Sequence, residues 1–368
     1  MLQGNILTPQ GWMVGRLHLQ EGRIQRIEGS LGDPSHNDLP YLLPGFIDLH
    51  VHGGGGHDIM EGAGAFAVIA RTHLRFGTTS LLATTMTAPR EEISVVLGAL
   101  GDYCRAPRGL AARVLGVHLE GPFINSGKLG AQPNFAHAAV LDEVDEFLRL
   151  APIRVITIAP EIAGHLPLIS ALAERGVRLQ IGHTLGSYED GVAAMEAGAT
   201  SFTHLYNAMS GLHHREPGMV GAALAHAQFA ELIPDLLHVH PGAIKVALRS
   251  IPCLYCVTDS TAAAGMPDGE YKLGSHTVTK CLGGVRLPDG TLAGSTLTMD
   301  QALRNLVKIG LPIAEASQRL SQFPADYLGL AERGRLTPGA WADIVRLDRS
   351  LTLETVWVEG DQFDLADA

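Results

Sequence analysis

The stretch LLPGFIDLHVHGGGGHD, residues 42–58, ends an apolar run in two histidines, His50 and His52, that are one residue apart. Residues i and i+2 of a β-strand share a face, so these imidazoles converge on one point at the end of a buried strand. The four glycines that follow let the chain turn sharply and bring its backbone close to whatever lies there. The stretch predicts a pair of metal ligands, although two incidental histidines among the 17 in the chain would give the same pattern.

The composition is that of a globular protein that can bury a large core. The chain has 368 residues, 46% of them hydrophobic and 18% charged, which is enough for one large α/β domain with or without a smaller one. Its net charge of −11 argues against a broad surface for nucleic acid or anionic lipid. A small anionic ligand is still compatible with this charge, because it needs only one or two local cations.

Nothing in the sequence predicts a membrane segment or a secretory leader. There is no run of about 18 apolar residues, and the first residues, MLQGNILTPQ, lack the charged and apolar regions of a signal peptide. We therefore expect a cytoplasmic protein with no membrane partner.

Strand-like apolar runs recur along the middle of the chain, each followed by a stretch with helical spacing. The eight runs are LLPGFIDLH, TTSLLATT, RVLGVHLE, IRVITIAP, VRLQIGH, TSFTHL, LIPDLLHV and CLYCVTD. Eight alternations of strand and helix predict a parallel (β/α)8, TIM-like barrel. The seventh run, residues 232–239, is the weakest, because Pro234 interrupts it and should displace the start of the strand.

Both ends of the chain have a different sequence pattern, in which short β-type runs are separated by glycines and polar turns. We predict that residues 1–43 and 335–368 together form a small β-sandwich domain and that residues 44–334 form the barrel. Within the barrel segment, residues 261–294 are predicted to be a long loop.

Polar residues with metal-binding side chains end most of these runs. They are His50, His52, Glu120, His183, His204, His238 and Asp259. In a (β/α)8 barrel the carboxyl ends of all strands open on one face, where active sites lie. Nitrogen and oxygen ligands suit Zn²⁺, Fe²⁺, Mn²⁺ or Co²⁺, and the coordination chemistry does not choose among them.

Two carboxylates in this set are candidates for special roles. Glu120 follows an apolar strand and precedes Gly121 and Pro122, and a carboxylate there could bridge two metals. Asp259 could take a proton from a metal-bound water and pass it to a leaving group, or it could only cap the segment that follows. His118 shares a face with Glu120, and we expect it in the core or behind the ligands.

Seven segments occur in one order: PGFIDLHVHG, GVHLEGPF, GHT, THLYNAM, REPG, LLHV and VTDSTAAAG. With GRLTPGAWADIV near the end, they make nearly the whole chain resemble the N-acetylglucosamine-6-phosphate deacetylases, a family of the amidohydrolase superfamily. The His-x-His pair alone indicates only the superfamily, whereas HLEGPF, THLYNAM and REPG are far more specific. The resemblance implies the barrel and an amide-hydrolysing activity.

The resemblance also implies a set of metal ligands. Glu120, His183 and His204 match the principal ligands, and Asp259 matches the catalytic acid and base. His50 and His52 match positions that vary within the family, where an intact pair can hold a second metal. We therefore expect one or two divalent ions, zinc, iron or similar, and favour two.

Further matches concern the substrate. Arg215 and His238 match residues that handle the sugar phosphate, and Asn207 and Ala208 match a loop that touches the sugar. A forked guanidinium suits phosphate well. Part of the phosphate site can come from a neighbouring subunit in such enzymes, which implies a homodimer.

The sequence departs from the family pattern at two positions. Gln132 stands where some relatives have a histidine that could hydrogen-bond the acetyl oxygen; glutamine can also donate, so we expect it to help stabilise the oxyanion. His240 stands where an aspartate is common, which could alter the phosphate pocket.

The expected reaction is removal of the acetyl group from N-acetylglucosamine 6-phosphate, giving glucosamine 6-phosphate and acetate. Another acetamido-sugar phosphate, such as the galactosamine epimer, remains an alternative. A cyclic-amide hydrolase with a carboxylated lysine is less favoured, because the fourth run, IRVITIAP, contains no lysine. A non-catalytic binding protein is disfavoured by the presence of Asp259 beside all the ligand positions.

Overall fold

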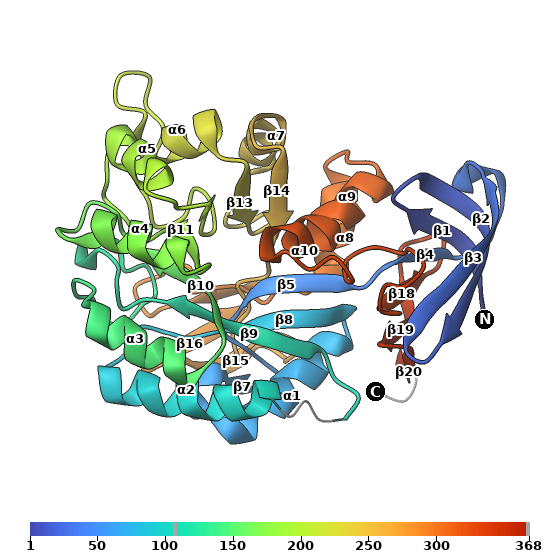
Figure 1. The fold of residues 1–368 in the computed structure, drawn as a ribbon, viewed down its shortest axis with the longest axis horizontal. Helices are drawn as coiled ribbons and strands as arrows, with labels where there is room; N and C mark the ends of the chain where they lie inside the picture. Colours follow the sequence, from blue (N-terminus) through green and yellow to red (C-terminus); the bar gives the residue numbers. More distant parts are fainter. Residues whose placement is uncertain (106–108, 366–368) are drawn as a thin grey trace.

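The computed structural model describes residues 1–105 and 109–365, and its central unit is the predicted parallel barrel (Figure 1). The eight barrel strands are β5 (Phe46–Val51), β8 (Thr78–Thr84), β9 (Arg113–Glu120), β10 (Ile153–Ile158), β11 (Arg178–Ile181), β12 (Ser201–Phe202), β13 (Phe229–Leu232) and β14 (Cys253–Cys256). Most of their residues are buried, which explains why the runs are almost continuously apolar.

Hydrogen bonds between main-chain atoms close these strands into a ring. Six of them form one sheet in the order β12-β11-β10-β9-β8-β5, and β13 pairs with β14. The Leu205 amide donates to the Glu231 carbonyl at 2.9 Å, which joins the end of β12 to β13. The Asp259 amide donates to the His50 carbonyl at 3.0 Å, which joins the end of β14 to β5. The carboxyl ends of the strands therefore surround one point.

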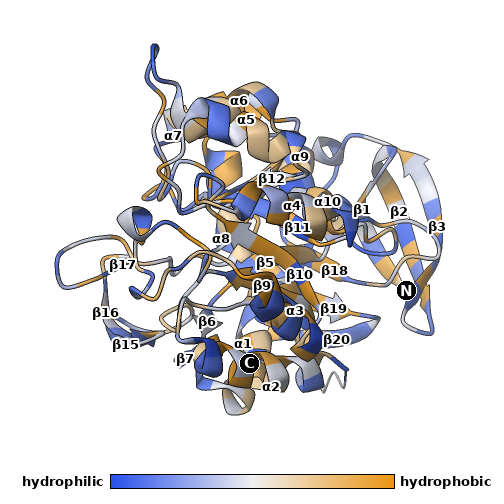
Figure 2. Ribbon diagram, turned by 60° about the vertical axis from the view of Figure 1, so that its left-hand side comes forward, coloured by the Kyte–Doolittle hydropathy of each residue, from blue (hydrophilic) through white to orange (hydrophobic). Residues whose placement is uncertain are grey.

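Helices follow the barrel strands and cover the outside of the ring. They are α1 (Ala63–Leu74), α2 (Arg90–Arg105), α3 (Leu141–Leu150), α4 (His165–Glu174), α5 (Tyr188–Glu196), α6 (Gly218–His226), α7 (Pro241–Ser250), α8 (Met299–Lys308), α9 (Ile313–Leu320) and α10 (Gln322–Leu328). Figure 2 shows mostly hydrophobic strands at the centre and helices of mixed hydropathy around them. Within the described residues, no helix combines the length and apolar character needed to cross a membrane.

The seventh strand lies earlier than the sequence predicted. β13 ends at Leu232, where the predicted run 232–239 begins, so that prediction was wrong. Pro234 has no N–H to donate, and Asp235 Oδ1 accepts from the amides of Leu237 and His238, which turns the chain instead of extending it. His238 consequently sits in a turn rather than at the end of a strand.

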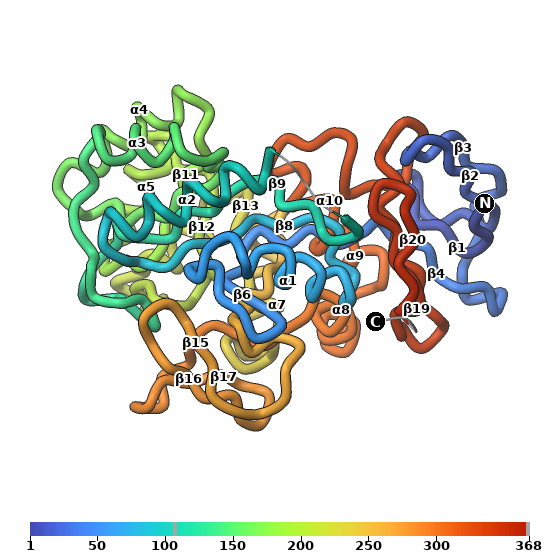
Figure 3. Tube along the Cα trace, turned by 90° about the horizontal axis from the view of Figure 1, so that it is seen from below, coloured from blue at the N-terminus to red at the C-terminus, as the bar shows by residue number. Residues whose placement is uncertain are grey.

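The chain termini form a separate seven-stranded sheet beside the barrel, as Figures 1 and 3 show. In spatial order its strands are β20 (Asp361–Asp364), β19 (Leu353–Val358), β18 (Ile344–Leu347), β4 (Tyr41–Pro44), β1 (Leu2–Thr8), β2 (Gly11–Gln20) and β3 (Arg23–Leu31). Both halves contribute to one apolar cluster that includes Ile6, Leu17, Leu42, Ile344 and Trp357. A small β-domain built from both ends of the chain is thus confirmed, whereas the exact boundaries 43/44 and 334/335 stay a prediction.

The segment 261–294 is more ordered than a loop. It contains an antiparallel sheet of β15 (Gly269–Leu273), β16 (His276–Cys281) and β17 (Gly284–Arg286), which projects from the barrel in Figure 3. Leu273, Val278 and Val285 pack together beneath it. This sheet and the stretch that follows it form part of the wall of the cavity described below.

Candidate active site

The barrel brings the predicted strand-end residues to one point. His50 and His52 lie at the end of β5, and Glu120 is the last residue of β9. His183, His204 and Asp259 follow β11, β12 and β14 in backbone conformations with φ of 47°, 28° and 51°. Such left-handed conformations are uncommon for residues with a side chain and concentrate at functional sites. At each of these three positions the chain turns sharply at the mouth of the barrel.

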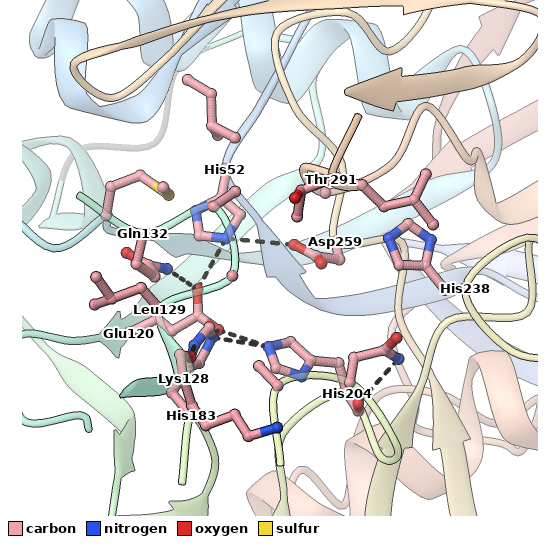
Figure 4. Close-up of a pocket in the computed structure, with 18 of the residues that line it drawn as sticks. His52, Glu120, Lys128, Leu129, Gln132, His183, His204, His238, Asp259 and Thr291 are labelled. Atoms are coloured by element: carbon pink, nitrogen blue, oxygen red, sulfur yellow. Dashed lines mark hydrogen bonds and ion pairs between the residues drawn. The ribbon is translucent and has the colours of Figure 1, made fainter. Parts of the chain in front are cut away.

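Glu120 lies at the centre of this cluster (Figure 4). Its Oε1 is 3.2 Å from His183 Nε2 and 3.1 Å from His204 Nε2. Its Oε2 is 3.1 Å from His52 Nε2 and 3.4 Å from His50 Nε2. One carboxylate therefore contacts two pairs of imidazoles, each through a different oxygen.

The side chains form two groups in which a metal ion could be held. Glu120, His183 and His204 make one group, and His50, His52 and Asp259 make the other. Asp259 Oδ1 lies 3.5 Å from His50 Nε2 and 3.4 Å from His52 Nε2. Because Glu120 reaches both groups, it could bridge two ions.

The hydrogen bonds of the imidazoles test whether a cation fits. His52 Nδ1 is 3.2 Å from the Thr84 carbonyl, and His183 Nδ1 is 2.8 Å from the Lys128 carbonyl. A carbonyl only accepts, so each Nδ1 carries a hydrogen, and Nε2 is the nitrogen left to bind a proton or a metal ion. These Nε2 atoms point at a carboxylate and toward a further imidazole, with 3.1 Å between the Nε2 atoms of His183 and His204. Such a donor set fits a divalent cation.

The pKa values of the cluster report the same attraction for positive charge. Burial lowers the pKa of His50, but the nearby carboxylates, Glu120 first, raise it well above its ordinary value. For His52, burial is likewise outweighed by hydrogen bonds with Asp259 and Glu120, and the pKa rises to about 9. Burial would raise the pKa of Glu120, yet the charge of His50 and bonds to the other imidazoles hold it well below its usual range.

A third group that could coordinate a metal, His50, His118 and Glu231, has another explanation. Both nitrogens of His118 already have partners, the Leu49 carbonyl at 3.1 Å and Thr157 Oγ1 at 2.7 Å. Burial, together with the charge of His50, lowers the pKa of His118 to about 4. His118 is therefore a core residue behind the ligands, as the sequence predicted.

Gln132 reaches the cluster, but it contacts a different group from the one expected. Its Nε2 donates to Glu120 Oε2 at 2.6 Å, and its Oε1 accepts from the Thr87 amide at 2.7 Å. The glutamine therefore fixes the orientation of the central carboxylate. Only the second hydrogen of its amide is left for a substrate.

A cavity of about 370 Å³ opens directly over the cluster. Asn207, Ala208, His238 and Gln132 line it together with Lys128. The substrate and catalytic roles expected of the first four stay predictions. Arg215 does not line it; this residue is exposed in the segment before α6 that projects from the barrel (Figures 1 and 2).

Two residues that sequence reasoning missed now stand out. Lys128 is the only Lys or Arg among the described residues that line the cavity, and its ammonium has no hydrogen-bond or ion-pair partner in the described part of the chain. Glu231 is fully buried with its carboxylate 3.0 Å from His50 Nδ1. The misplaced seventh strand hid Glu231, which would otherwise have appeared as a charged residue inside a barrel strand.

Fold and cluster together define a class: a (β/α)8 barrel with a candidate metal centre at the carboxyl ends of its strands. The sequence profile of the Amidohydrolase family matches residues 41–363. The chain belongs to this family.

Individual relatives are similar over most of their length. An N-acetylgalactosamine-6-phosphate deacetylase of Escherichia coli O157:H7 is 39% identical over 370 residues, covering 96% of each chain. An N-acetylglucosamine-6-phosphate deacetylase of Bacillus subtilis (strain 168) is 39% identical over 315 residues, covering 83% of this chain and 80% of the relative. A Mycobacterium smegmatis N-acetyl-D-glucosamine-6-phosphate deacetylase mutant, solved in complex with N-acetyl-D-glucosamine-6-phosphate, has a TM-score of 0.90, 32% identity and 98% and 97% coverage.

Proposed function

We propose that this chain is a metal-dependent deacetylase that converts N-acetylglucosamine 6-phosphate to glucosamine 6-phosphate and acetate. The observation that carries the proposal is the convergence of four imidazoles on Glu120, with Asp259 beside them, at the floor of a cavity large enough for a sugar phosphate. Similar relatives named for this reaction support the choice of substrate.

Each group at the site has a role in this reaction. Glu120, His183 and His204 would hold one divalent ion, zinc, iron or similar, and His50, His52 and Asp259 a second. An ion there lowers the pKa of a water molecule and polarises a carbonyl. Asp259 takes a proton from the attacking water and gives it to the departing amine, since its carboxylate is at the cavity wall. Gln132 orients Glu120 and offers its free amide hydrogen to the acetyl oxygen.

Acetate release tests the function directly. Purified protein loaded with Zn²⁺ or Fe²⁺ is given N-acetylglucosamine 6-phosphate, its galactosamine epimer and unphosphorylated N-acetylglucosamine. Fast release from the first substrate supports the proposal. No release from any of them, with metal bound, would mean that the substrate class is wrong.

The galactosamine epimer is a second candidate substrate with an observation in its favour. The relative named for that activity is as similar as the one named for the glucosamine activity, and the match spans more of the chain. If kcat/KM for the epimer exceeds the value for N-acetylglucosamine 6-phosphate, the epimer is the preferred substrate.

Lys128 is expected to bind the phosphate. Its ammonium is the unpaired cation of the cavity wall, and a charge-assisted hydrogen bond contributes about 2 kcal/mol, or roughly 30-fold in KM. Lys128→Met should raise KM for the sugar phosphate by that factor and leave kcat/KM for the unphosphorylated sugar unchanged. Lys128→Arg is the control that keeps the charge. An equal loss on both substrates would instead indicate disturbance of His183, which contacts the Lys128 carbonyl.

His238 should make phosphate binding depend on pH. Burial opposes its charge, but Asp235, whose Oδ2 is 2.6 Å from His238 Nδ1, raises its pKa above the ordinary value. Below that pKa the ring is a cation that donates from Nε2, and above it the ring is neutral, so KM for the sugar phosphate should rise with pH. His238→Gln should flatten this rise. An identical KM profile in the variant between pH 6 and 9 would contradict the assignment.

Arg215 would act on the phosphate of a neighbouring subunit. It is exposed and lies outside the cavity of its own chain, and it stands in a projecting segment that a neighbour can meet. We propose a homodimer in which Arg215 of one subunit contacts the phosphate bound by the other. Light scattering should give twice the 39.1 kDa mass of one chain, and a monomeric mass would contradict it.

A further inference from the structure

Glu231 is a buried carboxylate that the proposed mechanism does not use. It lies on β13, is 0% exposed, and points into the barrel behind the ligands. Its Oε2 is 3.0 Å from His50 Nδ1 and accepts from the His204 amide at 3.3 Å. Its Oε1 accepts from the Tyr255 hydroxyl at 3.4 Å. Burying a carboxylate costs several kcal/mol unless it is paired, so an apolar side chain would serve mere packing better.

The contact with His50 sets the chemical form of that imidazole. An ionised carboxylate can only accept, so His50 Nδ1 carries a hydrogen and Nε2 is the nitrogen left to bind a metal ion. That nitrogen faces His52 Nε2 at 3.1 Å and Asp259 Oδ1 at 3.5 Å. His52 also carries a hydrogen on Nδ1, but there the acceptor is a backbone carbonyl. The acceptor at His50 Nδ1 is a charged carboxylate. A charged partner makes the coordinating nitrogen more basic.

Glu231 also connects the two groups of candidate ligands. The same oxygen that contacts His50 accepts from the main chain of His204, and the Glu231 carbonyl accepts from the Leu205 amide at 2.9 Å. A single residue of the seventh strand thereby holds a ring of one group and the backbone of the other.

We propose that Glu231 is a positioning residue that holds His50 in the Nδ1–H form and so sets the metal affinity of the His50, His52 and Asp259 group. The inference rests on the metal site of the proposed function and not on its substrate. Metal binding is measured without any sugar, so a wrong substrate and a wrong role for Glu231 give different results.

The test is a double-mutant cycle with Zn²⁺ as the probe. Metal-free wild type, Glu231→Gln, His50→Ala and the double variant are titrated with Zn²⁺ against a competing chelator. Glu231→Gln should weaken one Zn²⁺ site about 10–100-fold, as loss of an outer partner of a ligand does. In the His50→Ala background the same change should have no further effect, because Glu231 acts through that ring. Long-range ¹H–¹⁵N NMR of the metal-free proteins, recorded above the pKa of His50 so that the ring is neutral, should show His50 as Nδ1–H in the wild type and a mixture in Glu231→Gln.

Tyr255→Phe is the matched control, because it removes the neighbour of the other carboxylate oxygen at nearly the same volume. It should keep wild-type Zn²⁺ affinity. Unchanged affinity in Glu231→Gln, or an equal loss with and without His50, would overturn the proposal. If Glu231→Gln does not fold, Glu231→Asp goes through the same cycle, since its shorter side chain withdraws the carboxylate from Nδ1 while keeping the charge.

Discussion

Replacing Asp259 by Asn should lower kcat by about 10²–10⁴-fold while the protein still binds metal. The amide has almost the same shape as the carboxylate and keeps one oxygen near His50 and His52, but it can neither take nor return a proton. Steady-state acetate release, measured beside the metal content of the same sample, checks both halves of the expectation.

The control for this variant is Asp235→Asn. It makes the same chemical change at a carboxylate that contacts His238 and not the candidate ligands. It should affect KM for the sugar phosphate more than kcat. An Asp259→Asn protein that keeps most of its turnover would remove Asp259 from the mechanism.

Glu120→Gln should abolish activity by a different route, namely loss of metal. Glu120 is 1% exposed and its two oxygens contact both imidazole pairs. The amide lacks the negative charge with which Glu120 would bind an ion, and its NH₂ group would point hydrogens at Nε2 atoms. Because outer partners of ligands already contribute 10–100-fold to affinity, we expect a loss above about 100-fold for Zn²⁺.

Elemental analysis after dialysis and a thermal unfolding curve separate the two consequences. The variant should be nearly free of metal and should unfold earlier than metal-free wild type, because the imidazoles lose their buried charged partner. A Glu120→Gln protein with a full complement of metal would show that this carboxylate is not a ligand.

The sequence was informative wherever an apolar strand ended in a histidine or a carboxylate. His50 and His52 could be placed on one face from their spacing, and Glu120 and Asp259 could be placed beside them, because strands of a parallel barrel end on one side. The barrel and the terminal β-domain followed from the order of apolar runs. The identity of the metal, the sugar preference and the cytoplasmic location stay predictions, since no contact within the chain bears on them.

The misplaced features share a physical cause, which is that they depend on non-local packing. β13 has only four residues, which is a short signal. The apolar residues after Pro234 have the pattern of a strand, although Asp235 turns the chain there. The sheet of β15–β17 was overlooked because its alternation of polar and apolar residues is short and lies in a glycine-rich segment. The partner of Gln132 could not be predicted, because no pattern in GKLGAQPNF reveals that its amide meets Glu120.

The junction between the first and last barrel strands has a consequence for how the protein matures. His50 and Asp259 are 209 positions apart, yet the Asp259 amide is bonded to the His50 carbonyl and their side chains share one ligand group. This group cannot exist on a ribosome-bound chain until the eighth strand has emerged and docked against the first. Glu120, His183 and His204 all precede residue 205, so the residues of their group emerge earlier. An ion held by the His50, His52 and Asp259 group would therefore bind only after the ring has closed.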